Sequence, residues 1–424
     1  MAKVKQRRED FVVREVTNLR LADGDFSVYR LEKSGIGTSE AMQRIARAWD
    51  LSNSQLRFGG RKDRHAITSQ TVTILNGPAQ DFEAENFSLR YLGSAAAAMN
   101  AKAIVANDFE LTIRDLDALA AERVSQTLQN ANFAIPNYFD LQRFGSVTSE
   151  GNFAAVPWCL GDYEKAVYYA LAEHTPQDSA PEREQRAILR DHWKDWPACK
   201  ARLDRSNRRS VVTYLVDHPE GFKKAAGLIQ RDMRSIYVSA LQSRIWNETV
   251  SRIIQESLRV QSNDGVQSNS DVQLQGDPIH AGGTLRIQKS PAGSLAYPAS
   301  AEAVEGLGEM PQLPTHLPLP SARPTKWPEG IREKLNAVCA EFGLTLHKLR
   351  LSYPRDVFFS RAARPTRLIP ERVECEIEAD ELSDAEKSKA VLRFRLQPGQ
   401  YATTVIKSLM LICNQQDDDD AALA

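Results

Sequence analysis

Short β-rich runs alternate with a helical pattern over the first 150 residues of this 424-residue chain. The β-rich runs cover residues 10–16, 26–31 and 67–75, and the helical pattern covers residues 38–49. A threonine and a serine stand at the start of that pattern, and one of them is expected to cap the helix. The alternation limits the possible folds, because strands and helices that follow each other closely in sequence usually pack together. We therefore expect a fold of mixed α and β structure.

The middle of the chain has a different character. From about residue 158 to residue 229 the pattern is largely helical, and residues 236–250 indicate a long helix. Within that helix Leu241, Ile245 and Val250 recur near helical spacing, which indicates one buried face.

Strand-like runs return near the end of the chain, at residues 373–377 and 391–396. A break at Pro398-Gly399 then leads into a helical pattern at residues 402–411. The two ends of the chain thus resemble each other and differ from the middle. Such a pattern is expected when one domain is inserted into another.

The length is sufficient for two or three domains, and the hydrophobic fraction of 42% is ordinary for a folded protein. No stretch approaches the roughly 20 apolar residues needed to span a bilayer, and the basic first ten residues do not resemble a signal peptide. The five cysteines are widely spaced and form no C-x-x-C pair, so neither a disulfide framework nor structural zinc is expected. We expect a cytoplasmic, monomeric protein that has no contact with a membrane.

The formal net charge of −1 conceals an uneven distribution of charge. Residues 1–70 hold 14 Lys and Arg against 9 Asp and Glu, and residues 182–234 hold 13 against 8. Solvated helix faces can produce similar surpluses. The segregation also suits a basic surface that binds the phosphates of a nucleic acid.

One acidic residue stands among four basic ones in the segment Phe58-Gly-Gly-Arg-Lys-Asp-Arg-His-Ala-Ile-Thr-Ser-Gln70. The two glycines permit a tight turn before it. The neighbouring cations favour the ionised form of Asp63, which would then be available as a nucleophile or base. Lys62, directly before it, is a candidate for binding a negatively charged substrate. The alternative is an ordinary charged turn at the surface.

Two aromatic residues stand beside an amide and an arginine in the segment Ile135-Pro-Asn-Tyr-Phe-Asp-Leu-Gln-Arg-Phe-Gly145. An aromatic side chain there could stack on a flipped base, while Arg143 or Asn137 holds the base edge or a phosphate. The alternative is that these aromatics belong to the hydrophobic core.

Five segments in the same order make the chain similar to the TruD family of tRNA pseudouridine synthases. They are Asp10-Phe-Val-Val-Arg-Glu-Val16, Gly60-Arg-Lys-Asp-Arg-His-Ala-Ile-Thr-Ser-Gln70, Asn137-Tyr-Phe-Asp-Leu-Gln-Arg-Phe-Gly145, Ser239-Ala-Leu-Gln-Ser-Arg-Ile-Trp-Asn247 and Phe394-Arg-Leu-Gln-Pro-Gly-Gln-Tyr-Ala-Thr403. The chain departs from the family at Asp140, where glycine is common, at Gln397, where proline usually follows the leucine, and over residues 265–330, which match loosely. These departures concern the contacts of the middle module more than the reaction.

The resemblance implies an α+β fold in which a catalytic core with a mixed, largely antiparallel sheet is split by an inserted α/β module. We place the first part of the core at residues 1–154, the inserted module at residues 155–350 and the second part of the core at residues 351–424. The implied activity is the isomerisation of uridine to pseudouridine in tRNA, by default at the thirteenth position, although other RNAs are open as substrates.

The resemblance also implies roles for individual residues. Asp63 would be the catalytic aspartate, Phe139 the aromatic residue stacked on the target uracil, and Asn137 a polar neighbour of the site. Lys5, six residues before Phe11, matches a basic residue that family members place near the aspartate. Whether Asp63 attacks the ribose or abstracts a proton to give a glycal is open.

No cofactor or metal is expected, because the reaction needs none and the sequence contains no phosphate-binding glycine loop, no G-x-G-x-x-G and no zinc-deaminase signature. Two alternatives remain. One is a catalytically silent RNA-binding protein on the same scaffold, against which the intact Asp63, Asn137 and Phe139 count. The other is an unrelated metabolic enzyme, which the missing cofactor motifs disfavour.

Overall fold

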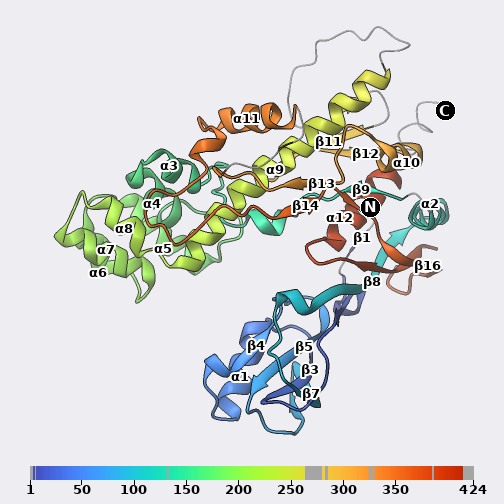
Figure 1. The fold of residues 1–424 in the computed structure, drawn as a ribbon, viewed down its shortest axis with the longest axis horizontal. Coiled ribbons are helices and arrows are strands. Elements are labelled where there is room, and N and C mark those ends of the chain that lie inside the picture. The colour runs from blue at the N-terminus through green and yellow to red at the C-terminus, as the bar shows by residue number, and fades with distance from the viewer. Residues whose placement is uncertain are drawn as a thin grey trace. The chain divides into compact units, whose positions relative to one another are not determined.

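The chain forms two compact units in a computed structural model (Figure 1). The structure describes residues 3–4, 6–130, 133–262, 279–281, 285–323, 327, 330–383 and 386–413. The first unit comprises Met1–Ile135, Ser300–Gly308 and Leu368–Ala424, and the second comprises Pro136–Ala299 and Glu309–Arg367. The chain passes between the units within β9 (Ile135–Pro136), between Ala299 and Ser300, within α10 (Ala301–Glu309) and within β15 (Arg367–Leu368). The outer boundaries of the second unit, after Ile135 and after Arg367, lie outside the insertion limits of 155 and 350 that we expected. A division into compact units does not define an inserted module, so those limits stay a prediction.

A ten-stranded sheet forms the frame of the described part of the first unit, in the order β16-β17-β8-β2-β5-β3-β7-β6, with β1 beside β8 and β4 beside β5. Only β2 and β5 pair in parallel, so the sheet is mixed and largely antiparallel, as expected. The strands are β1 (Lys3–Val4), β2 (Phe11–Thr17), β3 (Phe26–Lys33), β4 (Leu56–Phe58), β5 (Ile67–Leu75), β6 (Phe82–Ala84), β7 (Phe87–Ala95), β8 (Ile104–Leu116), β16 (Glu371–Ala379) and β17 (Ser388–Leu396).

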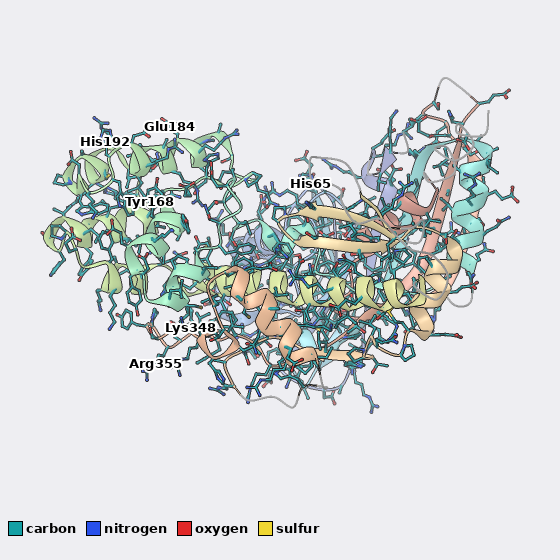
Figure 2. All side chains as sticks on the ribbon, turned by 90° about the horizontal axis from the view of Figure 1, so that it is seen from above. His65, Tyr168, Glu184, His192, Lys348 and Arg355 are labelled. Atoms are coloured by element: carbon teal, nitrogen blue, oxygen red, sulfur yellow. The ribbon has the colours of Figure 1, made fainter. Side chains whose placement is uncertain are left out.

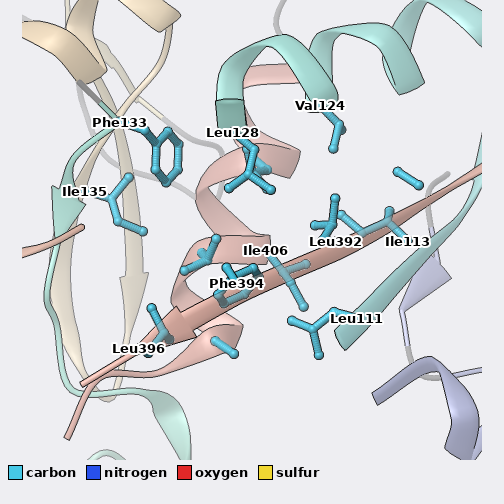
Figure 3. Close-up of a cluster of buried hydrophobic side chains, with 14 of the residues drawn as sticks. Leu111, Ile113, Val124, Leu128, Phe133, Ile135, Leu392, Phe394, Leu396 and Ile406 are labelled. Atoms are coloured by element: carbon cyan, nitrogen blue, oxygen red, sulfur yellow. The ribbon is translucent and has the colours of Figure 1, made fainter. Parts of the chain in front are cut away.

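Two segments far apart in sequence build one hydrophobic core in this unit. Helices α2 (Ala118–Gln129) and α12 (Ala402–Cys413) cover the part of the sheet formed by β8 and β17 (Figure 3). Alternate residues of β17 are buried there, among them Leu392, Phe394 and Leu396, as the two-residue period of a strand requires. The two ends of the chain therefore form one unit, in agreement with the pattern of the sequence.

A second core lies beneath α1 (Thr38–Ala48), which packs on β3, β4, β5 and β7. Its apolar face carries Ala41, Met42 and Ile45. The expected side-chain cap is absent from this helix: Gly37 occupies the capping position, and Thr38 is the first helical residue. The hydroxyl of Thr38 instead bonds outside the helix, as described below.

The second unit is largely helical over its first half and contains short strands over its second. Its long helix α9 (Arg231–Ser262) confirms the helix expected at residues 236–250. The single buried face expected there is wrong: Leu241, Ile245 and Val250 are buried, but so is every other residue from 240 to 251 except Arg244, so the helix is enclosed on nearly all sides. The other elements are α3 (Ala155–Leu160), α4 (Tyr163–Leu171), α5 (Ala180–Asp191), α6 (Trp196–Arg202), α7 (Asn207–Asp217), α8 (Phe222–Leu228), β10 (Ile279–Ala281), β11 (Leu285–Ser290), β12 (Gly293–Pro298), β13 (His316–Pro318), α11 (Ile331–Glu341) and β14 (Ala363–Pro365).

The side chains of the helical half of this unit are seen in Figure 2, where Tyr168 of α4, Glu184 of α5 and His192 just after α5 are labelled. Even the 32-residue α9 has no apolar stretch that could cross a membrane, and the same holds for every other helix in the described ranges.

Candidate active site

Asp63 lies in the loop that joins β4 to β5, which we call the aspartate loop (residues 59–66). The loop begins at Gly59, where a Cβ atom would lie 2.7 Å from Cδ1 of Ile104 and 3.0 Å from the carbonyl oxygen of Asn100. A side chain here would force Ile104 to shift and would crowd the Asn100 carbonyl, so glycine permits the close approach to the start of β8. Gly59 thus has a structural reason, whereas a Cβ atom at Gly60 would make only an ordinary contact, 3.8 Å from Cδ1 of Ile104.

Two side chains outside the aspartate loop hold its first half. The backbone N–H of Lys62 donates to Oγ1 of Thr38 at 3.0 Å, and that hydroxyl donates to Oε1 of Gln70 at 2.8 Å. Nε2 of Gln70 donates in turn to the carbonyl oxygen of Gly60 at 3.1 Å. Because Thr38 and Gln70 are both buried, this network fixes the loop against the sheet.

The side chain of Lys33, the last residue of β3, supports the centre of the loop. Its ammonium donates to the carbonyl oxygen of Asp63 at 2.7 Å and to that of Lys62 at 3.4 Å. Only 2% of Lys33 is exposed. Burial lowers the pKa of Lys33 from 10.5 to about 8, and the charge of Asp63 opposes that fall.

The carboxylate of Asp63 is half-buried, and its Oδ1 accepts the backbone N–H of His65 at 3.0 Å. This short-range bond orients the carboxylate. His65 itself is exposed and is labelled in Figure 2. The carboxylate is thus held by the backbone of its own loop.

Two of the basic residues next to Asp63 are paired with other acids. The ammonium of Lys62 lies 2.9 Å from Oε2 of Glu15 and donates to Oδ1 of Asn107 at 2.5 Å. Arg64 forms an ion pair with Glu40 at the start of α1. The Glu15 side chain is fully buried, so its pairing with Lys62 binds the loop to β2.

The other candidate residues lie together in the second unit, in residues 137–143. Asn137 is almost fully buried, and its side-chain Nδ2 donates to the carbonyl oxygen of Pro365 at 2.9 Å. Its Oδ1 and its backbone carbonyl oxygen both accept from Nη2 of Arg364 at 2.8 Å. Every polar group of Asn137 therefore binds the segment around β14, where Asn137 N–H also donates to Thr366.

Phe139 is 6% exposed, and both its backbone N–H and its backbone carbonyl bond to the side chain of Asn247 in α9. Its N–H donates to Oδ1 of Asn247 at 2.8 Å, and its carbonyl oxygen accepts from Nδ2 at 3.0 Å. The guanidinium of Arg364 lies 4.1 Å from the centre of the Phe139 ring, and Trp246 meets the ring edge-on at 5.6 Å. The exposed Arg143 lies 5.5 Å from the same ring.

The structure brings together Asp63 and Lys62 in the first unit, and Asn137, Phe139 and Arg143 in the second. Lys5 lies outside the described residues. No feature of the sequence assigned a role to Lys33, Glu15 or Arg364, although Glu15 is within the first of the five matching segments. Asn247 and Trp246 are within one of the five matching segments, whereas no sequence signal distinguished Lys33 or Arg364 from other basic residues.

Comparisons with known proteins identify the family of the chain. The sequence profile of the family described as tRNA pseudouridine synthase D (TruD) matches residues 1–409. A probable tRNA pseudouridine synthase D of Methanococcus maripaludis is 26% identical over 97% of this chain and 100% of its own length. The tRNA pseudouridine synthase D of Leptospira interrogans is 27% identical over 96% of both chains.

The fold also has a counterpart among solved structures. The crystal structure of the putative tRNA pseudouridine synthase D of Methanosarcina mazei matches 96% of this chain and 93% of its own, with a TM-score of 0.66 and 23% identity. That likeness establishes the fold, and the profile match along nearly the whole chain establishes the family. The chain belongs to the TruD family of tRNA pseudouridine synthases.

Proposed function

We propose that this protein isomerises uridine to pseudouridine in tRNA, with Asp63 as the catalytic carboxylate. The family match over residues 1–409 carries the proposal, because it includes the aspartate loop and every strand of the ten-stranded sheet. The relatives that match over almost their whole length are themselves described as tRNA pseudouridine synthases.

The reaction breaks the bond between N1 of uracil and the ribose, turns the detached base and rejoins it through carbon five. This chemistry has three requirements: first, a carboxylate that assists at the sugar; second, a surface that retains the base; and third, a loop that keeps its shape. Asp63 meets the first requirement, because its half-buried carboxylate is oriented by His65 N–H. The network of Thr38, Gln70 and Lys33 meets the third.

Phe139 is proposed as the surface that retains the uracil. The guanidinium over its ring and the two bonds to Asn247 hold this aromatic residue in one orientation. Arg143, exposed and next to the ring, is proposed to bind an RNA phosphate or the base edge. Asn137 acts by holding this segment to β14.

Lys62 is proposed to act on the reaction through the loop. Its ammonium is bound by Glu15 and Asn107, and its side chain is 11% exposed. These contacts support a role in holding the aspartate loop to the sheet next to the substrate. The proposed target is the uridine at the thirteenth position of tRNA.

The experiment that tests the function measures tritium release from tRNA labelled at carbon five of uridine. Wild-type protein should release tritium, and Asp63→Asn should release none while it binds tRNA with unchanged affinity, because the side chain keeps its shape and loses its charge. Asp23→Asn, a matched change at an exposed aspartate of the first unit, should behave as wild type. Turnover by Asp63→Asn within about tenfold of wild type, a barrier change of roughly 1.4 kcal/mol, would show that Asp63 is not the catalytic group.

A second measurement identifies the position. Pseudouridine mapping of tRNA treated with the protein should give one new site, at position 13, and a transcript with cytidine at that position should give none. Tight tRNA binding without any new pseudouridine would favour the silent RNA-binding protein instead.

A further inference from the structure

The burial of Lys33 is unusual for a lysine, since a cation placed in a protein interior loses its hydration and is normally paired with an acid. Within the described ranges its ammonium forms no ion pair with a carboxylate, and it donates only to the carbonyl oxygens of Lys62 and Asp63. Both acceptors belong to the aspartate loop. The burial of this charge is therefore energetically unfavourable, and its hydrogen bonds go to the candidate catalytic residue and to the residue before it.

The surroundings of Lys33 explain its acid–base behaviour. Its neighbours on the sheet are Thr68 of β5 and Phe87 of β7, and neither carries a charge. The charges that act on it come from the aspartate loop: Asp63 favours the ammonium, while Arg64 and Lys62 oppose it. Arg64 and Lys62 are themselves paired with Glu40 and Glu15. Burial is the largest influence and brings the pKa to about 8.

We propose that Lys33 is a positioning residue for the reaction: its protonated side chain holds the backbone of Asp63, and loss of that proton weakens this hold on the Asp63 peptide. This inference rests on the proposed function, because it assigns Lys33 to the group that Asp63 provides. The bond at 2.7 Å to the Asp63 carbonyl oxygen fixes the peptide plane from which the carboxylate projects. A neutral amine still has donors, but its bond to a carbonyl is weaker than that of an ammonium.

A purely structural role predicts a different result from a positioning role. A buried charge without a carboxylate partner destabilises the fold at neutral pH, so replacing it with an apolar side chain of similar length should not lower stability. A positioning role predicts that the same replacement slows the chemical step, since small displacements of a catalytic group reduce the rate strongly. The positioning role therefore predicts that the variant keeps its stability and loses catalytic rate.

The test uses the full-length protein with saturating tRNA, in single-turnover measurements from pH 6 to pH 9.5. Lys33→Met should slow the reaction at pH 7 by roughly tenfold or more, with tRNA affinity unchanged. The control is Lys102→Met, which removes the same charge from an exposed site of the same unit and should behave as wild type.

The pH profile gives the decisive readout. The wild-type and Lys102→Met rates should fall as the pH passes about 8, whereas the rate of Lys33→Met should show no such fall. Lys33→Gln, which keeps a neutral N–H donor, should recover part of the rate at pH 7 and should also lack the fall. An alkaline fall in Lys33→Met that coincides with that of the control, or a rate loss explained by weaker tRNA binding, would overturn the proposal.

Stability provides an independent readout. The pKa of Lys33 is about 8 in the folded protein and has its usual value of 10.5 in the unfolded chain, so the unfolded chain binds more protons between these two pH values. The contribution of Lys33 to stability therefore rises with pH over that window. Lys33→Met should be at least as stable as wild type at pH 7, and its advantage should shrink as the pH rises from 8 to 10.5.

Asp63→Asn is measured in the same assay. An active Asp63→Asn variant would remove the catalytic role of Asp63 and with it the proposed function as stated. An inactive Asp63→Asn variant together with a Lys33→Met variant that matches wild type would remove only the role of Lys33.

Discussion

The guanidinium carbon of Arg364 lies 4.1 Å from the centre of the Phe139 ring. The same side chain, 8% exposed, donates to both oxygens of Asn137 and to the carbonyl oxygen of Tyr138. One buried cation thus orders three consecutive residues that stand more than 220 positions away in sequence. This contact explains how an aromatic residue in a short irregular segment can keep one orientation.

Arg364→Met should lower the free energy of unfolding by about 1–3 kcal/mol, because the buried oxygens of Asn137 lose their donors. The rate of pseudouridine formation should fall as well, since Phe139 is no longer fixed. Chemical denaturation and single-turnover assays measure the two effects. Arg361→Met, at an exposed arginine three residues earlier, should change stability by less than about 0.5 kcal/mol. Equal stability of the two variants would show that the guanidinium does not support the Asn137 segment.

Phe139→Leu should lower the turnover rate roughly 5- to 150-fold, the equivalent of the 1–3 kcal/mol that stacking on a base contributes. Its affinity for tRNA should change little, because phosphate contacts dominate binding. Phe144→Leu is the matched control, since Phe144 is a buried phenylalanine of the same segment and has no proposed contact with the base. If both variants lose activity in parallel with stability, the role of Phe139 is one of packing alone.

Glu15→Gln should destabilise the protein by about 3–5 kcal/mol, because it leaves the Lys62 ammonium in a largely buried site without its carboxylate. Lys62→Met should have a similar cost for the converse reason. The double variant should recover most of the loss, since it contains no unpaired charge. Denaturation of all four proteins gives the coupling energy. Additive losses would mean that the two side chains do not act as a pair.

The affinity for tRNA should fall steeply with salt, with a logarithmic slope of roughly −0.7 to −0.9 for each phosphate contact. Some of the basic side chains in residues 182–234 form ion pairs within the protein. These pairs are Arg186 with Asp178, Arg208 with Glu182, and Arg234 with Asp356. The exposed cations of the same segment include Arg205 and Lys224.

Filter-binding titrations at several salt concentrations check the source of that slope. Arg205→Gln or Lys224→Gln should make it shallower by up to about one unit. Arg186→Gln should leave the slope unchanged and reduce stability, because the buried guanidinium also binds the carbonyl oxygens of Ala170 and Glu173. A slope that none of these variants changes would remove this segment from the RNA-binding surface.

Local patterns were sufficient to predict much of the fold. The β-rich runs at residues 10–16 and 26–31 became β2 and β3, and the helical pattern at residues 236–250 became part of α9. These predictions succeeded because side-chain periodicity is a property of neighbouring residues. The capping prediction at the start of α1 was wrong, since the Thr38 hydroxyl bonds to Lys62 N–H and Gln70 in place of its own helix.

The sequence by itself determined the alternation of elements and the acid of the aspartate loop, because each depends on residues near one another or on a motif with fixed spacing. It indicated the return of the chain's end to the first core only through the similar character of the two ends, and the tertiary structure showed the shared core. Only the tertiary structure decided which cations serve those motifs. Lys33 reaches Asp63 across 30 residues, and Arg364 reaches Asn137 across 227. Such pairings follow from strand register and from burial, which set the distance between the groups, their desolvation and their charge. No local pattern separates these two basic residues from the many that remain in solvent.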